Sequence, residues 1–187
     1  MTVYFLYGKT GSGKSYIGSL LEQHHIIHID GDNYITQTMK DCLAKRVQMT
    51  PTMIDEFVEA LIDVINQKKK ENPEQSFVIS QALYLDKHRL KLLKAIPDLQ
   101  FVLMDVKPVL RAGRISSRFQ NNESKVSLSY AIEMDKFFED PTHDIIRFEN
   151  NQDSDEALLE QIQEKMPALF SEEVKEALGF NHPLSFA

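Results

Sequence analysis

Residues 8–15 read Gly8-Lys9-Thr10-Gly11-Ser12-Gly13-Lys14-Ser15, which is the pattern G-x-x-x-x-G-K-S of a phosphate-binding loop. Glycines in this pattern let backbone N–H groups turn inward around phosphate oxygens, because no side chain stands in the way. Such a loop runs into the start of a helix, whose positive end attracts anions. The expected phosphate-binding residues are Gly8, Gly11, Ser12, Gly13, Lys14 and Ser15.

Two side chains at the end of this loop carry more specific expectations. Lys14 is placed to reach the β- and γ-phosphates of a nucleoside triphosphate as a mobile point charge. The Ser15 hydroxyl is placed to bind Mg²⁺. The loop therefore predicts that the chain binds a nucleoside triphosphate together with Mg²⁺, and ATP is the expected ligand.

The segments on either side of the loop support this interpretation. Val3–Tyr7 is a short apolar run that is typical of a buried strand, and Lys14–Gln23 has apolar residues at helical spacing. The alternative is an ordinary glycine turn. A strand directly before the loop and a helix directly after it are the context that confirms a phosphate-binding loop instead.

The size and charge of the chain limit the classes of protein to which it can belong. Its 187 residues are enough for one domain, 1–187, with a sizeable core. The formal net charge of −7 argues against a general nucleic-acid binder. No apolar run approaches the roughly 20 residues that span a membrane, and the early loop leaves no room for a signal peptide. The single cysteine, Cys42, cannot form an internal disulfide. Together these features predict a cytoplasmic enzyme. We also expect a monomer or a homodimer.

Short apolar runs alternate with longer stretches of helical periodicity along the whole chain. This alternation predicts a three-layer α/β fold, with a five-stranded parallel sheet covered by helices on both faces. The expected strands are 3–7, 26–30, 76–80, 101–106 and 144–148. The expected helices are 14–23, 33–47, 51–70, 86–95, 109–119, 128–139, 153–166 and 171–179.

Two carboxylates follow the second expected strand, in the sequence Asp30-Gly31-Asp32. Ligands of open parallel sheets bind at the carboxyl ends of the strands, where the phosphate-binding loop also lies. Carboxylates at this place suit the organisation of Mg²⁺ and the capture of a hydroxyl proton. The alternative is structural, because Asp32 could simply cap the helix that follows it.

Arg111, Arg114 and Arg118 fall three and four residues apart in the helix expected at 109–119, so they lie near one face. A polar loop and another helix follow, which is typical of a lid over an active site. Such a lid, at about 115–130, would place guanidinium groups on a transferring phosphate and exclude water. The alternative is a solvated basic helix face.

Together these features resemble the shikimate kinase/gluconate kinase group of small-molecule kinases, and gluconate kinases in particular. Those enzymes carry Ser-Ala-Leu-Lys after the third strand, where this chain reads Ser80-Gln81-Ala82-Leu83. Their lid helix has two arginines four residues apart, similar to Arg114 and Arg118. The resemblance covers residues 1–165, and a helical appendage is expected at about 168–187.

The resemblance implies a sheet of the nucleoside-monophosphate-kinase type and a single P-loop kinase domain. It implies an ATP- and Mg²⁺-dependent enzyme that phosphorylates a hydroxyl of a small polar metabolite, with a sugar acid as the leading acceptor. Asp32 would contact the acceptor hydroxyl and act as base, and Asp30 would support Mg²⁺ through water. Arg114 and Arg118 would close over the phosphates. The implied catalytic residues are Lys14, Asp32, Arg114 and Arg118, and the implied metal-binding residues are Ser15 and Asp30.

The chain departs from both families in their acceptor motifs. Gluconate kinases have a His-Pro pair soon after the Asp, where this chain continues Asn33-Tyr34-Ile35. Shikimate kinases have a glycine triplet after the third strand, where this chain has Ser80-Gln81-Ala82. The stretch 30–33 also looks like the matching stretch of adenylylsulfate kinases. The sequence therefore leaves the identity of the phosphoryl acceptor open.

Two rival functions follow from these departures. The first is a nucleoside, nucleotide or adenylylsulfate kinase, which would need an aromatic pocket such as Tyr34 and Phe57 could supply. The second is an ATP-binding regulatory or degenerate kinase. It would bind ATP without phosphorylating a small molecule, and it could use residues 171–187 to contact a partner.

Overall fold

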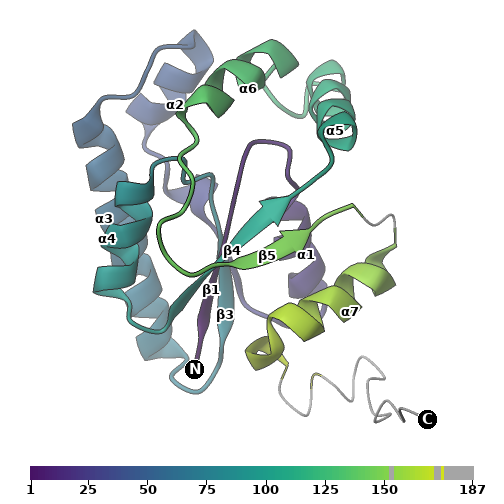
Figure 1. Ribbon diagram of the computed structural model, residues 1–187. Helices are drawn as coiled ribbons and strands as arrows, with labels where there is room; N and C mark the ends of the chain where they lie inside the picture. The colour runs from purple at the N-terminus through teal and green to yellow at the C-terminus, as the bar shows by residue number, and fades with distance from the viewer. Residues whose placement is uncertain (152–153, 171–173, 175–187) are drawn as a thin grey trace.

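The computed structural model describes residues 1–151, 154–170 and 174. Its centre is a five-stranded sheet, in which all the neighbouring strands run parallel, in the order β2-β3-β1-β4-β5 (Figure 1). The three-layer α/β fold and the parallel sheet expected from the sequence are confirmed. The strands are β1 Val3–Tyr7, β2 His28–Asp30, β3 Phe77–Ser80, β4 Leu99–Asp105 and β5 Ile146–Glu149.

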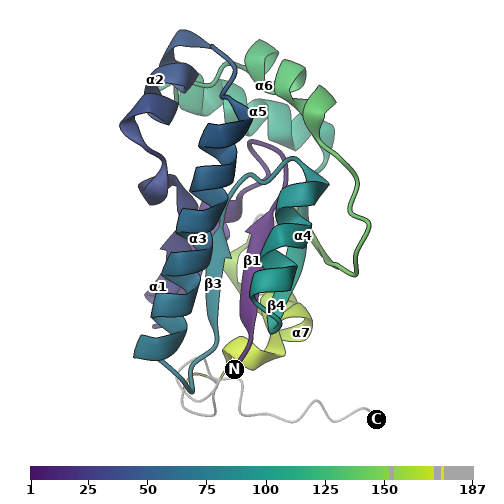
Figure 2. The ribbon, with the colours of Figure 1, turned by 90° about the vertical axis from the view of Figure 1, so that its left-hand side faces the viewer.

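Helices cover both faces of this sheet. One face packs against α3 and α4, and the other packs against α1 and α7 (Figures 1 and 2). Helices α2, α5 and α6 gather beyond the carboxyl ends of the strands. The helices are α1 Lys14–Gln23, α2 Gln37–Lys45, α3 Pro51–Glu71, α4 Asp86–Ala95, α5 Pro108–Gln120, α6 Leu128–Met134 and α7 Asp155–Lys165. Three 3₁₀ turns join them: η1 Gly31–Tyr34, η2 Asp135–Phe137 and η3 Pro167–Leu169.

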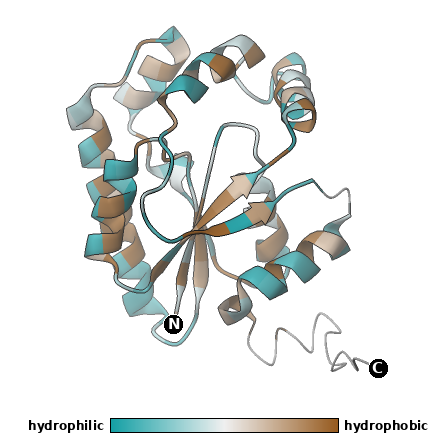
Figure 3. Ribbon diagram, viewed as in Figure 1, coloured by the Kyte–Doolittle hydropathy of each residue, from teal (hydrophilic) through white to brown (hydrophobic). Residues whose placement is uncertain are grey.

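The central strand β1 shows why the strands are continuous apolar runs. Val3, Phe5 and Tyr7 point to the layer of α3 and α4, whereas Tyr4 and Leu6 point to the layer of α1 and α7. Each of these side chains is buried, because successive side chains of a strand face opposite sides and both sides are covered. Figure 3 shows mostly apolar strands at the centre, whereas apolar and polar residues alternate along the helices around them.

The strand order fixes the place of the phosphate-binding loop. β1 lies in the middle, hydrogen-bonded to β3 on one side and to β4 on the other. The loop that leaves β1 therefore emerges between the ends of its two neighbours. β2 pairs with β3 at one edge, which brings the Asp30–Asp32 turn to the same end of the sheet.

The helix expected at 33–47 is interrupted in the structure. Residues 31–34 form η1, Ile35 is extended, and α2 begins only at Gln37. The Thr36 hydroxyl accepts a hydrogen bond from Met39 N at 3.2 Å and so caps a new helix. Similarly, the helix expected at 128–139 ends at Met134 and continues as η2.

At the C-terminal end, η3 packs onto α7, and Leu169 and Phe170 join the core on that face. The terminal helix expected at 171–179, and with it most of the expected appendage at 168–187, falls outside the described residues. Within the described part of the chain, no helix combines the length and the apolar character needed to cross a membrane.

Two glycines give a matched test of the packing. A Cβ at Gly18 would lie 2.2 Å from the buried ring of His28, whereas a Cβ at Gly113 in α5 would meet nothing within 4 Å. Gly18→Ala should therefore lower the free energy of unfolding by about 1–3 kcal/mol through overpacking. Gly113→Ala should raise it by about 0.5–1 kcal/mol, because alanine loses less entropy in a helix. Urea unfolding of both variants checks this, and equal effects would contradict the packing of α1 against β2.

Candidate functional site

The phosphate-binding loop has a backbone shape that demands glycine. Gly11 and Gly13 have φ angles of +83° and +90°, which side-chain-bearing residues rarely adopt. A Cβ at Gly13 would lie 2.0 Å from Asn150 Nδ2, and a Cβ at Gly11 would lie 2.6 Å from Ile115 Cγ1. The loop is thus closed in by α5 and by the end of β5, and it has no room for larger residues.

Lys14, the first residue of α1, is folded back over this loop. Its Nζ donates hydrogen bonds to Gly8 O at 3.0 Å and to Lys9 O at 3.1 Å. The residue is only 9% exposed. Burial lowers the pKa of Lys14 to about 8, and the nearby Asp32 carboxylate opposes this shift. Binding of a polyanion would therefore stabilise this buried ammonium group, because the carbonyls that now accept its hydrogen bonds carry no charge.

Asn150 holds the loop from outside, and the sequence analysis did not single it out as a site residue. It directly follows β5 and is 1% exposed. Its Nδ2 donates to Ser12 O at 2.9 Å, and its backbone N donates to Asp105 O at 2.7 Å. Asn150 therefore ties the loop to the ends of β4 and β5. Its position at the carboxyl end of a strand was the signal that could have identified it.

The two carboxylates after β2 have separate roles. Asp30 Oδ1 accepts from Asp32 N at 3.0 Å, so Asp30 is the residue that caps η1. The alternative that Asp32 is the cap is therefore wrong. The Asp32 side chain instead accepts a hydrogen bond from Gln81 Nε2 at 3.1 Å. Gln81 Oε1 in turn accepts from Ala82 N at 2.6 Å, which fixes the orientation of the Gln81 amide.

One cavity of about 340 Å³ brings most of the predicted site residues together. Its lining includes Gly11, Lys14 and Ser15 from the loop and from α1, and both Asp30 and Asp32 from the turn after β2. Residues 80–85 around the end of β3 form another wall, and residues of α2, α3, α4, α5 and α6 and of the segments between them complete the described lining. A phosphate-binding loop and a free carboxylate thus face the same space.

The structure divides the three arginines of α5 between different environments. Arg111 Nε donates to Thr10 O at 2.6 Å, and its guanidinium forms a two-pronged ion pair with Asp135 at 2.5 and 2.8 Å. Arg114 Nη1 is buried 3.6 Å from the Cβ position of Gly13. Arg118 is exposed and lines the cavity. Of the two arginines expected in the site, one lies beside the loop and one at the cavity, while Arg111 anchors the loop.

A buried arginine in α4 holds residues 83 and 84, which belong to the wall of the cavity that follows β3. Arg89 is 0% exposed, and its Nη1 donates to Leu83 O at 2.7 Å. Its Nη2 donates to Glu139 O at 2.7 Å, and Asp86 balances its charge at 3.0 Å. Arg89 therefore joins the residues that follow β3 to the segment that follows α6.

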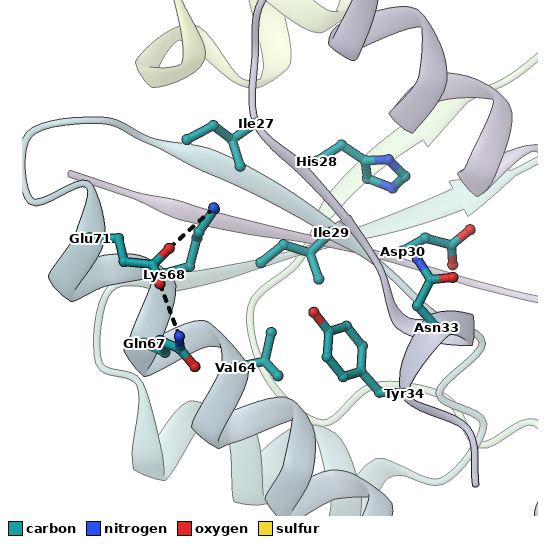
Figure 4. Close-up of a pocket in the computed structure, with 10 residues that line it drawn as sticks. All are labelled: Ile27, His28, Ile29, Asp30, Asn33, Tyr34, Val64, Gln67, Lys68 and Glu71. Atoms are coloured by element: carbon teal, nitrogen blue, oxygen red, sulfur yellow. Dashed lines mark hydrogen bonds and ion pairs between the residues drawn. The ribbon is translucent and has the colours of Figure 1, made fainter. Parts of the chain in front are cut away.

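Figure 4 shows a second cavity, of about 320 Å³, along the outer edge of the sheet between β2 and α3. Tyr34 lies there, near a polar cluster in which Gln67 and Lys68 both bond to Glu71. Tyr34 is absent from the lining of the first cavity, whereas Phe57 belongs to it. The pairing of Tyr34 with Phe57 in one aromatic pocket is therefore wrong.

Comparison with known proteins gives similarity of fold and not of sequence. No protein-family model matches the chain, and no curated protein matches it significantly. A sugar kinase from Janibacter sp. HTCC2649 matches with a TM-score of 0.71 and 13% identity, over 93% of this chain and 98% of that one. A gluconokinase from Sinorhizobium meliloti 1021 matches with a TM-score of 0.68 and 19% identity, over 97% and 98%.

The APS kinase of Mycobacterium tuberculosis, in complex with AMPPNP and APS, matches with a TM-score of 0.58 and 20% identity. The match covers 87% of this chain and 95% of that one. At such identities these matches show a shared fold, and they confirm the resemblance to P-loop small-molecule kinases at that level.

The role of Asn150 can be tested by removing its amide. Asn150→Ala leaves Ser12 O without its side-chain donor in a buried place, so the free energy of unfolding should fall by about 1–3 kcal/mol. The neighbouring Asn151 is a matched control, because its Oδ1 accepts from Lys107 N at an exposed position. Asn151→Ala should cost about 0.5 kcal/mol or less. Equal losses in urea unfolding would mean that Asn150 does not hold the loop.

Proposed function

We propose that this chain is an ATP- and Mg²⁺-dependent phosphotransferase that acts on a hydroxyl of a small molecule. The observation that carries the proposal is the single cavity shared by Lys14, Ser15 and Asp32. A phosphate-binding loop alone would support nucleotide binding. A free, oriented carboxylate in the same space adds the group that an acceptor hydroxyl needs.

The residues of the loop fit a triphosphate. The first N–H groups of α1 have no partner inside the helix, and the loop runs directly into them. Lys14 supplies the positive charge, and its hydrogen-bond acceptors in the described part of the chain are neutral: the carbonyls of Gly8 and Lys9 and the hydroxyl of Ser12. A phosphate that took over these hydrogen bonds would also relieve the cost of the buried charge.

The residues also fit Mg²⁺. Ser15 is exposed in the cavity, and one Asp30 oxygen caps η1 while the other is left for a water-mediated contact. Among the described residues no group of three His, Cys, Asp or Glu could hold a metal, which suits an ion bound mainly by phosphates and water. Bound there, Mg²⁺ would neutralise charge on the phosphate oxygens.

Asp32 is the base in this proposal. Gln81 fixes one carboxylate oxygen through the 3.1 Å hydrogen bond, and the side chain is exposed to the cavity. In this arrangement Asp32 would orient the acceptor hydroxyl and accept its proton, while Lys14, Arg114 and Arg118 would stabilise charge on the transferring group. Most of the rate enhancement would come from positioning and charge stabilisation.

The lid in this proposal is the segment at about 115–130, from α5 into α6. Ser124, Val126 and Tyr130 of this segment reach the cavity. Closure of the segment would exclude water from the transferring phosphate. A sugar acid is the acceptor suggested by the likeness of fold to a gluconokinase, and adenylylsulfate is the one suggested by the likeness to APS kinase.

Asp32→Asn tests the base. The amide keeps the size of the side chain but cannot accept the proton, so phosphoryl transfer should fall about 10²- to 10⁴-fold. ATP affinity should change little at about pH 6.5, where Lys14 stays charged; at higher pH it should fall, because the Asp32 carboxylate helps to keep Lys14 charged. Asp41→Asn is the matched control, since Asp41 bonds to Gln37 on the exposed side of α2. An unchanged rate in Asp32→Asn would remove Asp32 from this role.

The lowered pKa of Lys14 predicts a pH dependence of ATP binding. The polyanion favours the charged lysine, and the free protein loses that charge as the pH rises through about 8. Affinity should therefore be nearly full at about pH 7, about half of that at pH 8, and about tenfold weaker at pH 9, because about a tenth of Lys14 is then charged. Calorimetry from pH 7 to 9.5 measures this. Lys14→Ala should bind weakly with no such slope, and a flat profile in the unaltered protein would contradict the account.

A further inference from the structure

One part of the lining of this cavity, here called the apolar end, is built from apolar side chains. It lies between α2, the first turns of α3 and the lid helix α6. The side chains that decide its character are Met39, Leu43, Met49, Ile54, Phe57 and Met134. Met39 and Phe57 also belong to the hydrophobic core, so this wall is part of the folded framework.

The charged groups of the described lining are Lys14, Asp30, Asp32 and Arg118, three of which come from the start of α1 and from the turn after β2. Asp30 and Asp32 lie close enough to Lys14 to raise its pKa, and Arg118 lies close enough to lower it. The lining also contains His88, whose Nε2 lies 3.3 Å from the Asp55 carboxylate. Burial is the main cause that lowers the pKa of His88, which disfavours its charged form. Ser124 and Tyr130 add only neutral hydroxyls.

These facts weigh against an anionic or highly hydroxylated acceptor. In the proposed function Arg118 is engaged with the transferring phosphate, so the carboxylate of a sugar acid against the apolar side chains would have no described cation to pair with, and an unpaired buried charge is costly. The many hydroxyls of a polyol would lose their hydrogen bonds to water and find few partners on a wall of methionine, leucine, isoleucine and phenylalanine.

We propose that the acceptor is an uncharged alcohol with an apolar, ring-sized body, an inference that rests on the proposed phosphotransferase function. Its hydroxyl lies at Asp32, and its body lies against Met39, Phe57 and Met134. Methionine side chains adapt to irregular shapes and make favourable sulfur–aromatic contacts, which suits a ring. The cavity of about 340 Å³ also has to hold the end of the triphosphate, so the body is limited to one ring and a short chain.

The reaction balances without any further reagent. The hydroxyl oxygen of the alcohol forms a bond to the γ-phosphorus of ATP, and the bond from that phosphorus to the β–γ bridging oxygen breaks. ADP leaves with the electron pair of that bond. The hydroxyl proton passes to Asp32 and from there to solvent, and the products are a phosphomonoester and ADP.

The test compares acceptors of different chemistry on the same enzyme with ATP and Mg²⁺. The probes are 2-phenylethanol and 3-phenyl-1-propanol as uncharged ring alcohols, gluconate as a sugar acid and glycerol as a small polyol. Formation of phosphomonoester gives kcat/KM for each. We expect kcat/KM for a phenyl alcohol to exceed that for gluconate by about 100-fold, the discrimination that an unpaired polar or charged group in an apolar pocket can cause.

Two exposed apolar residues supply matched variants. Leu43 lines the cavity and is 37% exposed, whereas Val47 is 54% exposed and does not line it. Leu43→Asp places a charge at the apolar end, so kcat/KM for the phenyl alcohols should fall about tenfold or more while ATP affinity is kept. Val47→Asp should leave both unchanged. Because both side chains are exposed, neither variant is expected to prevent folding.

The outcomes separate this inference from the function on which it rests. Faster transfer to gluconate or glycerol would overturn the apolar acceptor and leave the phosphotransferase standing. Binding of a phenyl alcohol to the protein with AMPPNP, detected by ligand NMR and lost in Leu43→Asp, with no transfer to any probe, would support the apolar end and count against the phosphotransferase. No saturable binding of either phenyl alcohol would overturn the inference.

Discussion

The structure depends on how the loop between β1 and α1 is held from outside. Four of its carbonyl oxygens have side-chain donors: Lys14 binds those of Gly8 and Lys9, Arg111 binds that of Thr10, and Asn150 binds that of Ser12. These donors come from α1, α5 and the residue after β5, so three parts of the chain meet at this loop. With its carbonyls engaged in this way, the loop keeps a fixed shape while the N–H groups at the start of α1 remain for an anion.

The same contacts connect the loop to the helices above the sheet. Arg111 holds Thr10 with one part of its guanidinium and Asp135, at the end of α6, with the rest. Arg89 holds the backbone of Glu139 a few residues later. The segment from α5 to η2 is thus fixed near both ends, whereas the described hydrogen bonds of residues 121–126 run within the segment itself. That is the arrangement expected of a lid, because a covering segment must move while its attachments stay in place.

Sequence patterns that depend on neighbouring residues predicted the fold well. The glycine loop, the apolar runs and the helical spacing gave the five parallel strands and most helices, because each of these signals is local. The interruption of 33–47 was missed, because it depends on a single cap at Thr36. The contact of Asn150 with Ser12 joins residues 138 apart in the sequence, and that of Gln81 with Asp32 joins residues 49 apart. Spacing along a helix could likewise not show that Arg111 and Arg118 face different partners, since those partners lie on other elements.

The central claim is that the loop and Asp32 act together to move a phosphoryl group from ATP to an alcohol. The most direct measurement is a time course by ³¹P NMR of ATP, Mg²⁺ and the protein with a mixture of ring alcohols, sugar acids and polyols. The account predicts that a phosphomonoester signal grows in step with ADP, and that neither appears with Lys14→Ala. Formation of ADP and inorganic phosphate alone, or tight ATP binding with no change in any phosphorus signal, would contradict it.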